Sequence, residues 1–321
     1  MTSLTPTQWP EILTLGEPLI EFNQTSPLDK QYLQGFGGDV STVAIAAARF
    51  GARAGIITRI GSDHFGDLLL ELWQQEAVDT HCVLRDPTAP TGVYFVSHNE
   101  TGHRFSYLRS GSAASRITPD HLPLDRIHST RWLHVSSISQ AISESSSETV
   151  SLAIATARSA GKKISYDPNL RLALWSLERA RDTIRATAAL TDLFLPSLED
   201  IVTLSGATSA EQALEWCIET GARQVVLKLG ARGVMAYLEG QIVSIAPERV
   251  NMVDATGAGD CFAGVLLACL CAGEDMQTAM THANAAAALA TTGFGAVAPL
   301  PKRHQVLQRL ASQSPESSHV S

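Results

Sequence analysis

The sequence predicts an α/β protein built on a doubly wound, mostly parallel sheet. Short apolar runs of strand length alternate along the chain with stretches whose apolar residues share one helical face. This alternation favours parallel strand pairing, because each helix returns the chain to the same edge of the sheet. With 321 residues, 45% of them hydrophobic, the chain can bury the core of one such large domain.

The predicted elements follow one another in a regular order. The first strands are expected at Glu11–Leu15 and Ala54–Ile60, with a helix over Val40–Phe50 between them that Gly51 ends. Later strands, each with a helical stretch after it, are expected at Trp132–Val135, Ile164–Tyr166, Leu193–Leu195 and Val225–Leu229. The last helices are expected at Cys261–Cys271, at Gln277–Thr291 and in a segment that ends near Ala311. One domain over residues 1–311 and a disordered tail over 312–321 are therefore predicted.

Two stretches interrupt the alternation. Thr91–Val96 and Arg104–Leu108 surround the turn Asn99–Gly102, which is typical of a β-hairpin. Residues 19–36 also look extended, so the segments 19–36 and 91–108 predict a small β-structure outside the main sheet. Such an appendage can act as a lid over a site, and a plain surface hairpin fits the pattern equally well. A third hairpin is expected near Gly233–Ile245.

The charge balance and the length of the apolar runs argue against nucleic acid and membrane as partners. There are 24 Lys and Arg against 32 Asp and Glu, a net charge of −8, and no basic run offers a footprint for nucleic acid. The longest apolar run, Cys261–Gly273, is too short to cross a membrane. A secretory signal would begin with a positively charged region, and no Lys or Arg precedes Lys30. We expect a cytoplasmic protein that binds neither nucleic acid nor membrane.

The cysteines, histidines and first glycine turn carry no familiar cofactor motif. The five cysteines are odd in number and form no CxxC pair, which indicates free thiols. The ten histidines are scattered, and none is expected to join a carboxylate in a cluster with the spacing of a zinc site. Gly16–Pro18 is not the dinucleotide fingerprint GxGxxG, which argues against a dehydrogenase.

The strongest chemical signal is Asp254–Asp260, which runs directly into an apolar helix. Small residues ahead of a helix leave backbone N–H groups unpaired, and the helix dipole adds positive charge there. The turn therefore suits an anion such as a transferring phosphoryl group, with Asp260 as the acceptor of a proton from an attacking hydroxyl. On this chemistry alone, a structural turn with an N-capping aspartate is an equal alternative.

Three motifs, in order and at the expected spacing, resemble the ribokinase (PfkB) sugar-kinase family. Asp254–Asp260 resembles the C-terminal signature of that family, and Gly37-Gly38-Asp39 before its helix resembles the N-terminal one. Lys228–Gly233 is similar to the strand and turn that line the nucleotide, and the resemblance covers residues 11–310. It implies a ribokinase-like fold with a small β-sheet lid, and a reaction that uses ATP and Mg²⁺. A requirement for a monovalent cation stays open.

The resemblance also implies roles at the catalytic turn and in the sugar pocket. Asp260 would take the proton from the primary hydroxyl of the sugar, while backbone amides stabilise charge on the phosphoryl group. These amides belong to Gly257, Ala258 and Gly259. The residues that would contact or cover the sugar are Gly37, Gly38, Asp39, Tyr94 and Tyr107. For the two tyrosines, cross-strand packing is an equal alternative.

On the nucleotide side, the resemblance implies that Lys228, Gly230 and Gly233 line ATP and that Asn284 lies near the adenine. The family motif Asn-x-x-Glu, linked to Mg²⁺ and phosphate, falls at Ser197–Asp200 in this chain. Asp200 keeps the charge with a shorter reach, so we expect it to act on Mg²⁺ through a water, with Glu199 as the competing choice. Thr42 stands where the family usually has an asparagine that contacts a sugar hydroxyl, which leaves the recognised hydroxyl pattern open.

Two further segments indicate the substrate class. Tyr107–Ser115 is similar to the lid-exit segment of 2-keto-3-deoxygluconate kinases, and Asp167–Arg171 also occurs there, although fructokinases have a similar run. A keto-deoxy sugar acid carries a carboxylate that a guanidinium binds bidentately, so Arg109 and Arg171 are the candidate ligands. Arg109 could instead be a surface arginine of the hairpin. Arg171 could brace its loop or face a phosphate.

The sequence therefore predicts an ATP-dependent 2-keto-3-deoxygluconate kinase. A fructokinase or another neutral-sugar kinase is the main alternative. A non-catalytic sugar-binding protein is a further one, and a nucleoside kinase would leave both arginines without a purpose. A homo-oligomer formed through the exposed edge of the lid is a hypothesis.

Overall fold

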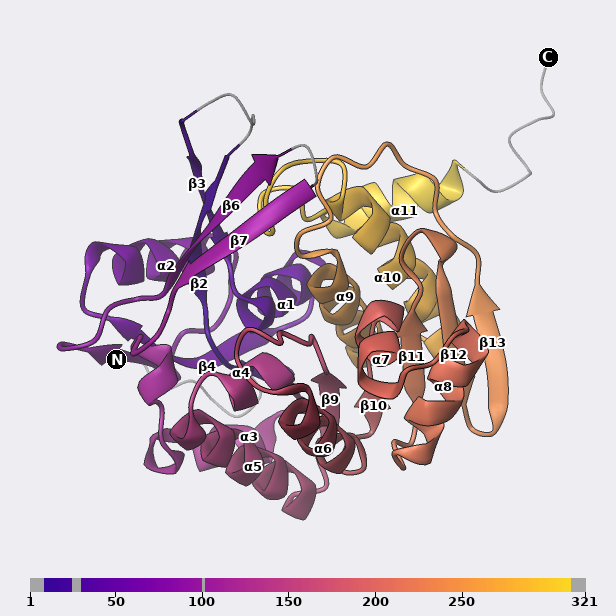
Figure 1. Ribbon diagram of the computed structural model, residues 1–321, viewed down its shortest axis with the longest axis horizontal. Coiled ribbons are helices and arrows are strands. Elements are labelled where there is room, and N and C mark those ends of the chain that lie inside the picture. The colour runs from indigo at the N-terminus through magenta and orange to yellow at the C-terminus, as the bar shows by residue number, and fades with distance from the viewer. Residues whose placement is uncertain (1–8, 25–29, 100–101, 313–321) are drawn as a thin grey trace.

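The computed structural model describes residues 9–24, 30–99 and 102–312. In this part of the chain a nine-stranded sheet carries helices on both faces, and a separate four-stranded sheet stands at one end (Figure 1). The large sheet runs in the order β13 (Gln241–Ile245), β12 (Val234–Leu238), β11 (Val225–Lys228), β10 (Leu193–Phe194), β9 (Lys163–Asp167), β8 (Trp132–Ser136), β1 (Ile12–Leu15), β4 (Ala54–Gly61) and β5 (Val83–Asp86). Neighbouring strands pair in parallel except that β12 is antiparallel to both of its neighbours. The predicted fold class is confirmed.

The strands of this sheet are apolar on both sides because helices cover both faces. In β1, Ile12 belongs to one core cluster, whereas Leu13 and Leu15 belong to the other. The first cluster packs against α1 (Asp39–Arg49), α2 (His64–Gln75), α9 (Ala258–Ala272), α10 (Met276–Ala290) and α11 (Arg303–Ala311). The second packs against α3 (Leu124–Ser129), α5 (Glu144–Ser159), α6 (Leu177–Ala188), α7 (Leu198–Ser205) and α8 (Ala210–Glu219).

The strand order reverses at β1, which places a crevice at the carboxyl edge of the sheet. The chain runs from β1 through β4 to β5 on one side and then crosses back to β8 on the other. In such sheets ligands bind beyond the carboxyl ends of the strands at this point. Glu17 follows β1 here, Asp167 ends β9 and Lys228 ends β11.

The smaller sheet has the order β3 (Leu33–Gly37), β2 (Leu19–Asn23), β6 (Val93–Asn99) and β7 (Gly102–Leu108). Its strands lie almost entirely within the two segments that the sequence singles out, and β6 and β7 form the predicted hairpin. The tip of that hairpin at residues 100–101 and the expected tail beyond Ser312 lie outside the described residues. We refer to this four-stranded sheet as the lid sheet.

The prediction of a helix after every strand is wrong at β11. The short helical turn Gly230–Arg232 follows β11, and β12 and β13 then form the predicted third hairpin. Gly230 and Gly233 take the left-handed φ values of 60° and 87°, which reverse the chain before a helix can form. The short α4 (Ser137–Ala141) adds a helix directly after β8.

Candidate active site

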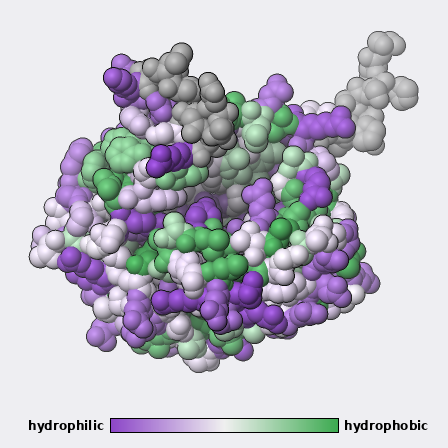
Figure 2. Space-filling view, in the orientation of Figure 1, coloured by the Kyte–Doolittle hydropathy of each residue, from purple (hydrophilic) through white to green (hydrophobic). Residues whose placement is uncertain are grey.

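A pocket of about 800 Å³ lies between the lid sheet and the carboxyl edge of the large sheet. Figure 2 shows this face of the molecule hollowed near its centre, with hydrophilic side chains around the opening. Most of the predicted site residues line the pocket: Gly38, Asp39, Tyr94, Tyr107, Arg109, Arg171, Asp200, Lys228, Gly230, Gly257, Gly259 and Asp260. The predicted residues Gly37, Ala258, Gly233 and Asn284, all of them described, are not part of its lining.

The catalytic turn enters the pocket at the N-terminus of α9. Gly257 caps this helix in the left-handed region, with φ at 76°, and an added Cβ would lie 2.8 Å from the Ala296 carbonyl oxygen. Both constraints require glycine at this position. The Ala258 amide donates to the Ala255 carbonyl at 3.2 Å, so it is already engaged. The first turn of a helix leaves further amides without helical acceptors, and the predicted donor Gly259 lies in this turn.

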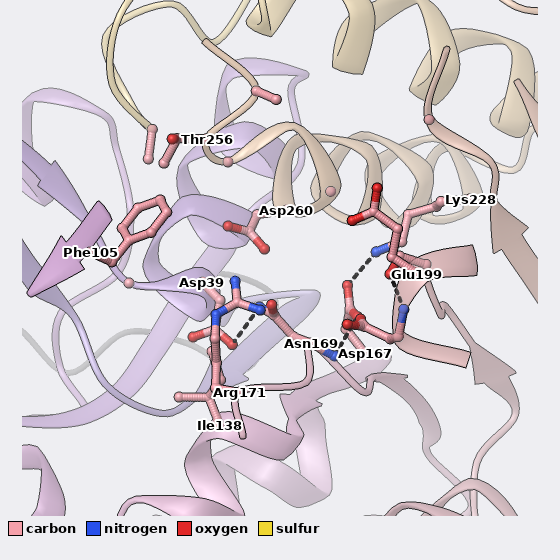
Figure 3. A pocket seen from close by; sticks show the side chains of 18 of the residues that line it. Asp39, Phe105, Ile138, Asp167, Asn169, Arg171, Glu199, Lys228, Thr256 and Asp260 are labelled. Atoms are coloured by element: carbon pink, nitrogen blue, oxygen red, sulfur yellow. Dashed lines mark hydrogen bonds and ion pairs between the residues drawn. The ribbon is translucent and has the colours of Figure 1, made fainter. Parts of the chain in front are cut away.

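Asp260 is the third residue of α9, and its carboxyl group points to the centre of the pocket (Figure 3). Burial raises the pKa of Asp260 to about 8, and the charges of Asp39 and Asp167 add to this effect, whereas Lys228 and Arg171 oppose it. A carboxyl group in a cleft with such a perturbed pKa marks a functional site.

The helices α1 and α9 bring two such aspartates together. An added Cβ on Gly264 of α9 would lie 2.7 Å from the Ala46 side chain of α1, so the two helices approach closely. As a result both N-termini open into the pocket, α1 with Asp39 and α9 with Asp260. Thr42 of α1 is fully buried, and its hydroxyl donates to the Gly38 carbonyl at 3.1 Å. That hydroxyl is therefore turned into the helix.

Lys228 extends from the end of β11 toward the catalytic turn. Its ammonium lies 2.5 Å from the Asp167 carboxylate and close to Gly259, where an added Cβ would lie 3.2 Å from the Lys228 Nζ. The other Asp167 oxygen accepts from the Asn169 amide at 3.0 Å, and the Asn169 side chain donates to Asp39 at 3.3 Å. The sequence singled out the run Asp167–Arg171 but gave Asp167 and Asn169 no role. Their place directly after a buried strand was the available signal.

The Ser197–Asp200 segment begins α7 beside Lys228. Ser197 caps this helix, because its hydroxyl accepts from the Asp200 amide at 3.1 Å. Burial raises the pKa of Asp200, and the Asp167 charge adds to it. Glu199 also lines the pocket but is exposed. Carboxylate oxygens are the donors that Mg²⁺ prefers, so Asp200 and Asp167 fit a place for that ion.

On the lid side, Tyr94 donates a hydrogen bond to the buried Glu21, and its ring stacks on Tyr107 with centroids 5.8 Å apart. An added Cβ on Gly37 would lie 2.7 Å from the Tyr94 ring, so this glycine makes room for the tyrosine. Contact of Gly37 with a sugar stays a prediction. Burial raises the pKa of Glu21, which the sequence did not single out.

The two predicted arginines differ in their surroundings. Arg109 is 9% exposed and forms an ion pair with the fully buried Glu17, whose other oxygen accepts from Ser112 at 2.6 Å. The alternative of a surface arginine is therefore wrong for Arg109. Arg171 is exposed to the pocket and donates to the Leu170 carbonyl at 2.8 Å. Within the described ranges no carboxylate lies within 4 Å of the Arg171 guanidinium.

On the predicted nucleotide side, Gly230 lines the pocket, whereas Gly233 and Asn284 contact the segment after β13. An added Cβ on Gly233 would lie 2.9 Å from the Pro247 nitrogen, and the Asn284 side chain donates to the Ala246 carbonyl at 2.9 Å. Direct contact of Gly233 and Asn284 with a nucleotide stays a prediction.

A glycine turn at a helix N-terminus, a half-buried carboxyl group that faces the pocket next to it and a lysine beside the turn suit the transfer of a phosphoryl group to a hydroxyl, which is the chemistry of a small-molecule kinase. The sequence agrees, since it matches the family model "pfkB family carbohydrate kinase" over residues 11–303. The chain belongs to this family of carbohydrate kinases.

Its relatives divide between two substrate classes. A 2-dehydro-3-deoxygluconokinase of Thermoproteus tenax is 34% identical over 307 residues, which cover 92% of this chain and 93% of that protein. A fructokinase of Vibrio alginolyticus is 34% identical over 280 residues, or 85% of this chain and 90% of that protein. A ribokinase II-type protein from E. coli, solved with ATP and Mg²⁺, superposes with a TM-score of 0.86 at 26% identity over 94% of this chain and 99% of that one. No helix in the described ranges is long and apolar enough to span a membrane.

Proposed function

We propose that the protein transfers the γ-phosphoryl group of ATP to the terminal hydroxyl of 2-keto-3-deoxygluconate. The observation that carries the reaction is Asp260, half-buried at the N-terminus of α9 and facing the pocket with a raised pKa. The observation that carries the substrate is Arg171, whose guanidinium has no carboxylate partner within the described ranges. Figure 3 shows Arg171 near Asp39 and Asp260, and we expect the sugar to bind beside these residues.

In the proposed reaction the acceptor hydroxyl gives its proton to Asp260 as its oxygen attacks phosphorus. A base with a pKa near the working pH is well matched to this transfer. The charge on the phosphoryl group would be stabilised by the Gly257 and Gly259 amides and by the Lys228 ammonium, which lies beside that turn. Asp200 and Asp167 would hold Mg²⁺, which neutralises phosphate charge when bound. Closure of the lid sheet would exclude water and prevent hydrolysis of ATP.

The sugar acid would be recognised through its carboxylate. Arg171 can offer two parallel N–H groups to that carboxylate, while the charge of Arg109 is largely matched by Glu17. Tyr94 and Tyr107 also line the pocket and would cover the sugar from the lid sheet. We therefore give Arg171 the main role in binding the acid and Arg109 a supporting one.

One observation favours a fructokinase instead. The buried pair of Glu17 and Arg109 leaves one of the two expected cations compensated, and a neutral hexose needs no free arginine. The alternative predicts that Arg171→Gln has little effect on turnover of the true sugar. The proposal predicts that this change raises KM for the sugar acid at least tenfold.

A coupled ADP-release assay with ATP and Mg²⁺ tests the proposal. The panel holds 2-keto-3-deoxygluconate, its galactonate epimer, fructose, ribose and adenosine, and Asp260→Asn is the catalytic control. Turnover confined to the keto-deoxy acids and lost in the control is the expected result. Turnover on fructose would retain the mechanism and overturn the substrate. Sugar binding without any ADP release would support a non-catalytic binding protein.

We also propose that two copies associate through their lid sheets. Leu33 on the edge strand β3 is 58% exposed, and Leu108 on the opposite edge strand β7 is 68% exposed. Open strand edges with apolar side chains favour pairing with a second chain. Sedimentation of the full-length protein tests this, and a monomer at all concentrations would contradict it.

A further inference from the structure

Three potential metal ligands meet at the end of α9 that is remote from Asp260. Cys269 lies in the last turn of α9, Glu274 follows the helix and His282 lies on α10. Their ligand atoms all lie within 4.8 Å of one another. The sequence did not single out any of these three residues as a metal ligand. The spacing of these residues matches no familiar zinc motif, and only the turn between the two helices brings them together.

The backbone fixes this arrangement. Gly273 ends α9 in the left-handed region with φ at 87°, and the Glu274 amide donates to the Cys269 carbonyl at 3.1 Å. This bond closes a Schellman turn, which carries Glu274 back beside Cys269. Asp275 then caps α10 by accepting from the Thr278 amide at 2.9 Å. The three side chains are thus held by two helix ends rather than by a loose loop.

The distances in the cluster are close to those of a tetrahedral zinc site. The Cys269 sulfur lies 3.6 Å from the His282 Nδ1, which in turn lies 2.9 Å from a Glu274 oxygen. Zinc bonds of roughly 2.3 Å to sulfur and 2.0–2.1 Å to nitrogen, at a tetrahedral angle, separate those two ligands by roughly 3.6 Å. Nitrogen and oxygen ligands would be roughly 3.3 Å apart, so the contact between Glu274 and His282 has to widen.

We propose that Cys269, Glu274 and His282 bind one zinc ion, with a water as the fourth ligand. A set of one thiolate, one imidazole and one carboxylate favours zinc over Mg²⁺ or Ca²⁺, which prefer oxygen alone. The second Glu274 oxygen lies 3.7 Å from the Arg303 guanidinium, which orients the carboxylate. The side chains of Glu274 and His282 are 20% and 15% exposed, so an ion can enter from the surface.

The role expected of this ion is to link α9 to α10. Nine positions of α9 separate Cys269 from Asp260, which corresponds to roughly 14 Å along the helix. Zinc at this distance should raise the melting temperature and leave kcat unchanged.

The test uses the full chain, stripped of metal with a chelator and titrated with Zn²⁺ against a chromophoric competitor. The same chain is loaded with Co²⁺, whose absorption spectrum reports thiolate ligation and tetrahedral geometry. The variants are Cys269→Ser and His282→Gln, and the matched control is Cys271→Ser, which removes a thiol two positions away on the same helix. All five cysteines are free, so neither of the two cysteine substitutions breaks a disulfide.

We expect the unmodified chain and Cys271→Ser to bind one equivalent and to melt at a higher temperature with zinc. Cys269→Ser and His282→Gln should weaken binding at least about 100-fold, more than the loss of an outer-shell partner does. Equal binding by all four proteins, or no binding by the unmodified chain, would overturn the proposal. A Co²⁺ spectrum without a thiolate band would overturn it even if a variant failed to fold.

Discussion

Replacing Asp260 by asparagine should abolish activity and at the same time stabilise the fold above acid pH. The unfolded chain ionises this carboxyl group near its ordinary pKa of 3.8, whereas in the folded protein the pKa is raised to about 8. A raised folded pKa means that the stabilising contribution is complete below pH 4 and is lost as the pH rises toward 8. Asparagine has no such loss, because its side chain cannot ionise.

The size of this gain follows from the two pKa values. At pH 7 a pKa shift of this size lowers the free energy of unfolding by up to roughly 4 kcal/mol. Solvent reaches the pocket and screens the charge, so we expect about 1–2 kcal/mol, or about 2–4 °C in melting temperature. The loss of the general base should lower kcat by about 10²–10⁴-fold.

The assay is a series of thermal melts of both proteins from pH 5.5 to pH 8, without nucleotide or sugar. The matched control is Asp254→Asn in the same turn. Burial works against ionisation of Asp254, but hydrogen bonds from Thr256, Gly295 and Asn23 outweigh it and lower the pKa. Its stabilising contribution is lost only as the pH falls below the ordinary value. Asp254→Asn should therefore destabilise the protein by a similar amount across the whole range.

Two results would refute the reasoning about Asp260. One is a difference in melting temperature between Asp260→Asn and the unmodified protein that stays constant from pH 5.5 to pH 8. The other is a kcat for the variant within tenfold of the unmodified enzyme. The first would mean that the carboxyl group is already ionised at low pH, and the second that another group takes the proton.

Three further changes test the contact between α1 and α9, the buried ion pair of Arg109, and the edge of the lid sheet. Gly264→Ala should push α9 away from α1, where the added methyl meets the Val43 carbonyl, and cost about 1–3 kcal/mol with a loss of kcat; unchanged melting and kinetics would contradict the close contact. Arg109→Ala leaves the Glu17 carboxylate buried and unpaired, which should cost about 3–5 kcal/mol in denaturant melts, most of it recovered when Glu17→Gln is added. Leu108→Lys should lower the oligomeric state in sedimentation without changing kcat, and an unchanged state would exclude β7 from the interface.

The elements that the sequence predicted well are those whose signal is local. The apolar run of β1 and the apolar face of α1 can be identified from a few neighbouring residues. The turn before α9 can be identified from Gly257, which takes the left-handed φ of 76°. Asp260 could be singled out because its place relative to that turn is fixed by covalent neighbours. Local chemistry was sufficient in each of these cases.

The parts that escaped prediction depend on contacts between distant segments. Glu17 and Arg109 come from strand ends far apart in the chain, and nothing near either residue indicates the pairing. The close approach of Tyr94, on another strand, to Gly37 was likewise not visible in the sequence. His282 looked like a scattered histidine because its partners lie across a helix turn. Such pairings become visible only when the strand order and the helix packing are known.

The charge in the pocket connects these observations to the proposed reaction. Seven carboxyl groups and four cationic side chains line it among the described residues, so a fully ionised pocket would be net negative before any substrate enters. Burial raises the pKa of Asp39, Asp200 and Asp260, and the neighbouring negative charges add to this effect. An anionic nucleotide and a sugar acid would add further negative charge, which a divalent cation, Lys228 and Arg171 would offset. The proposed reaction needs the ionised form of Asp260, which Lys228 and a bound divalent cation would favour, so that the carboxylate can take the proton of the substrate hydroxyl.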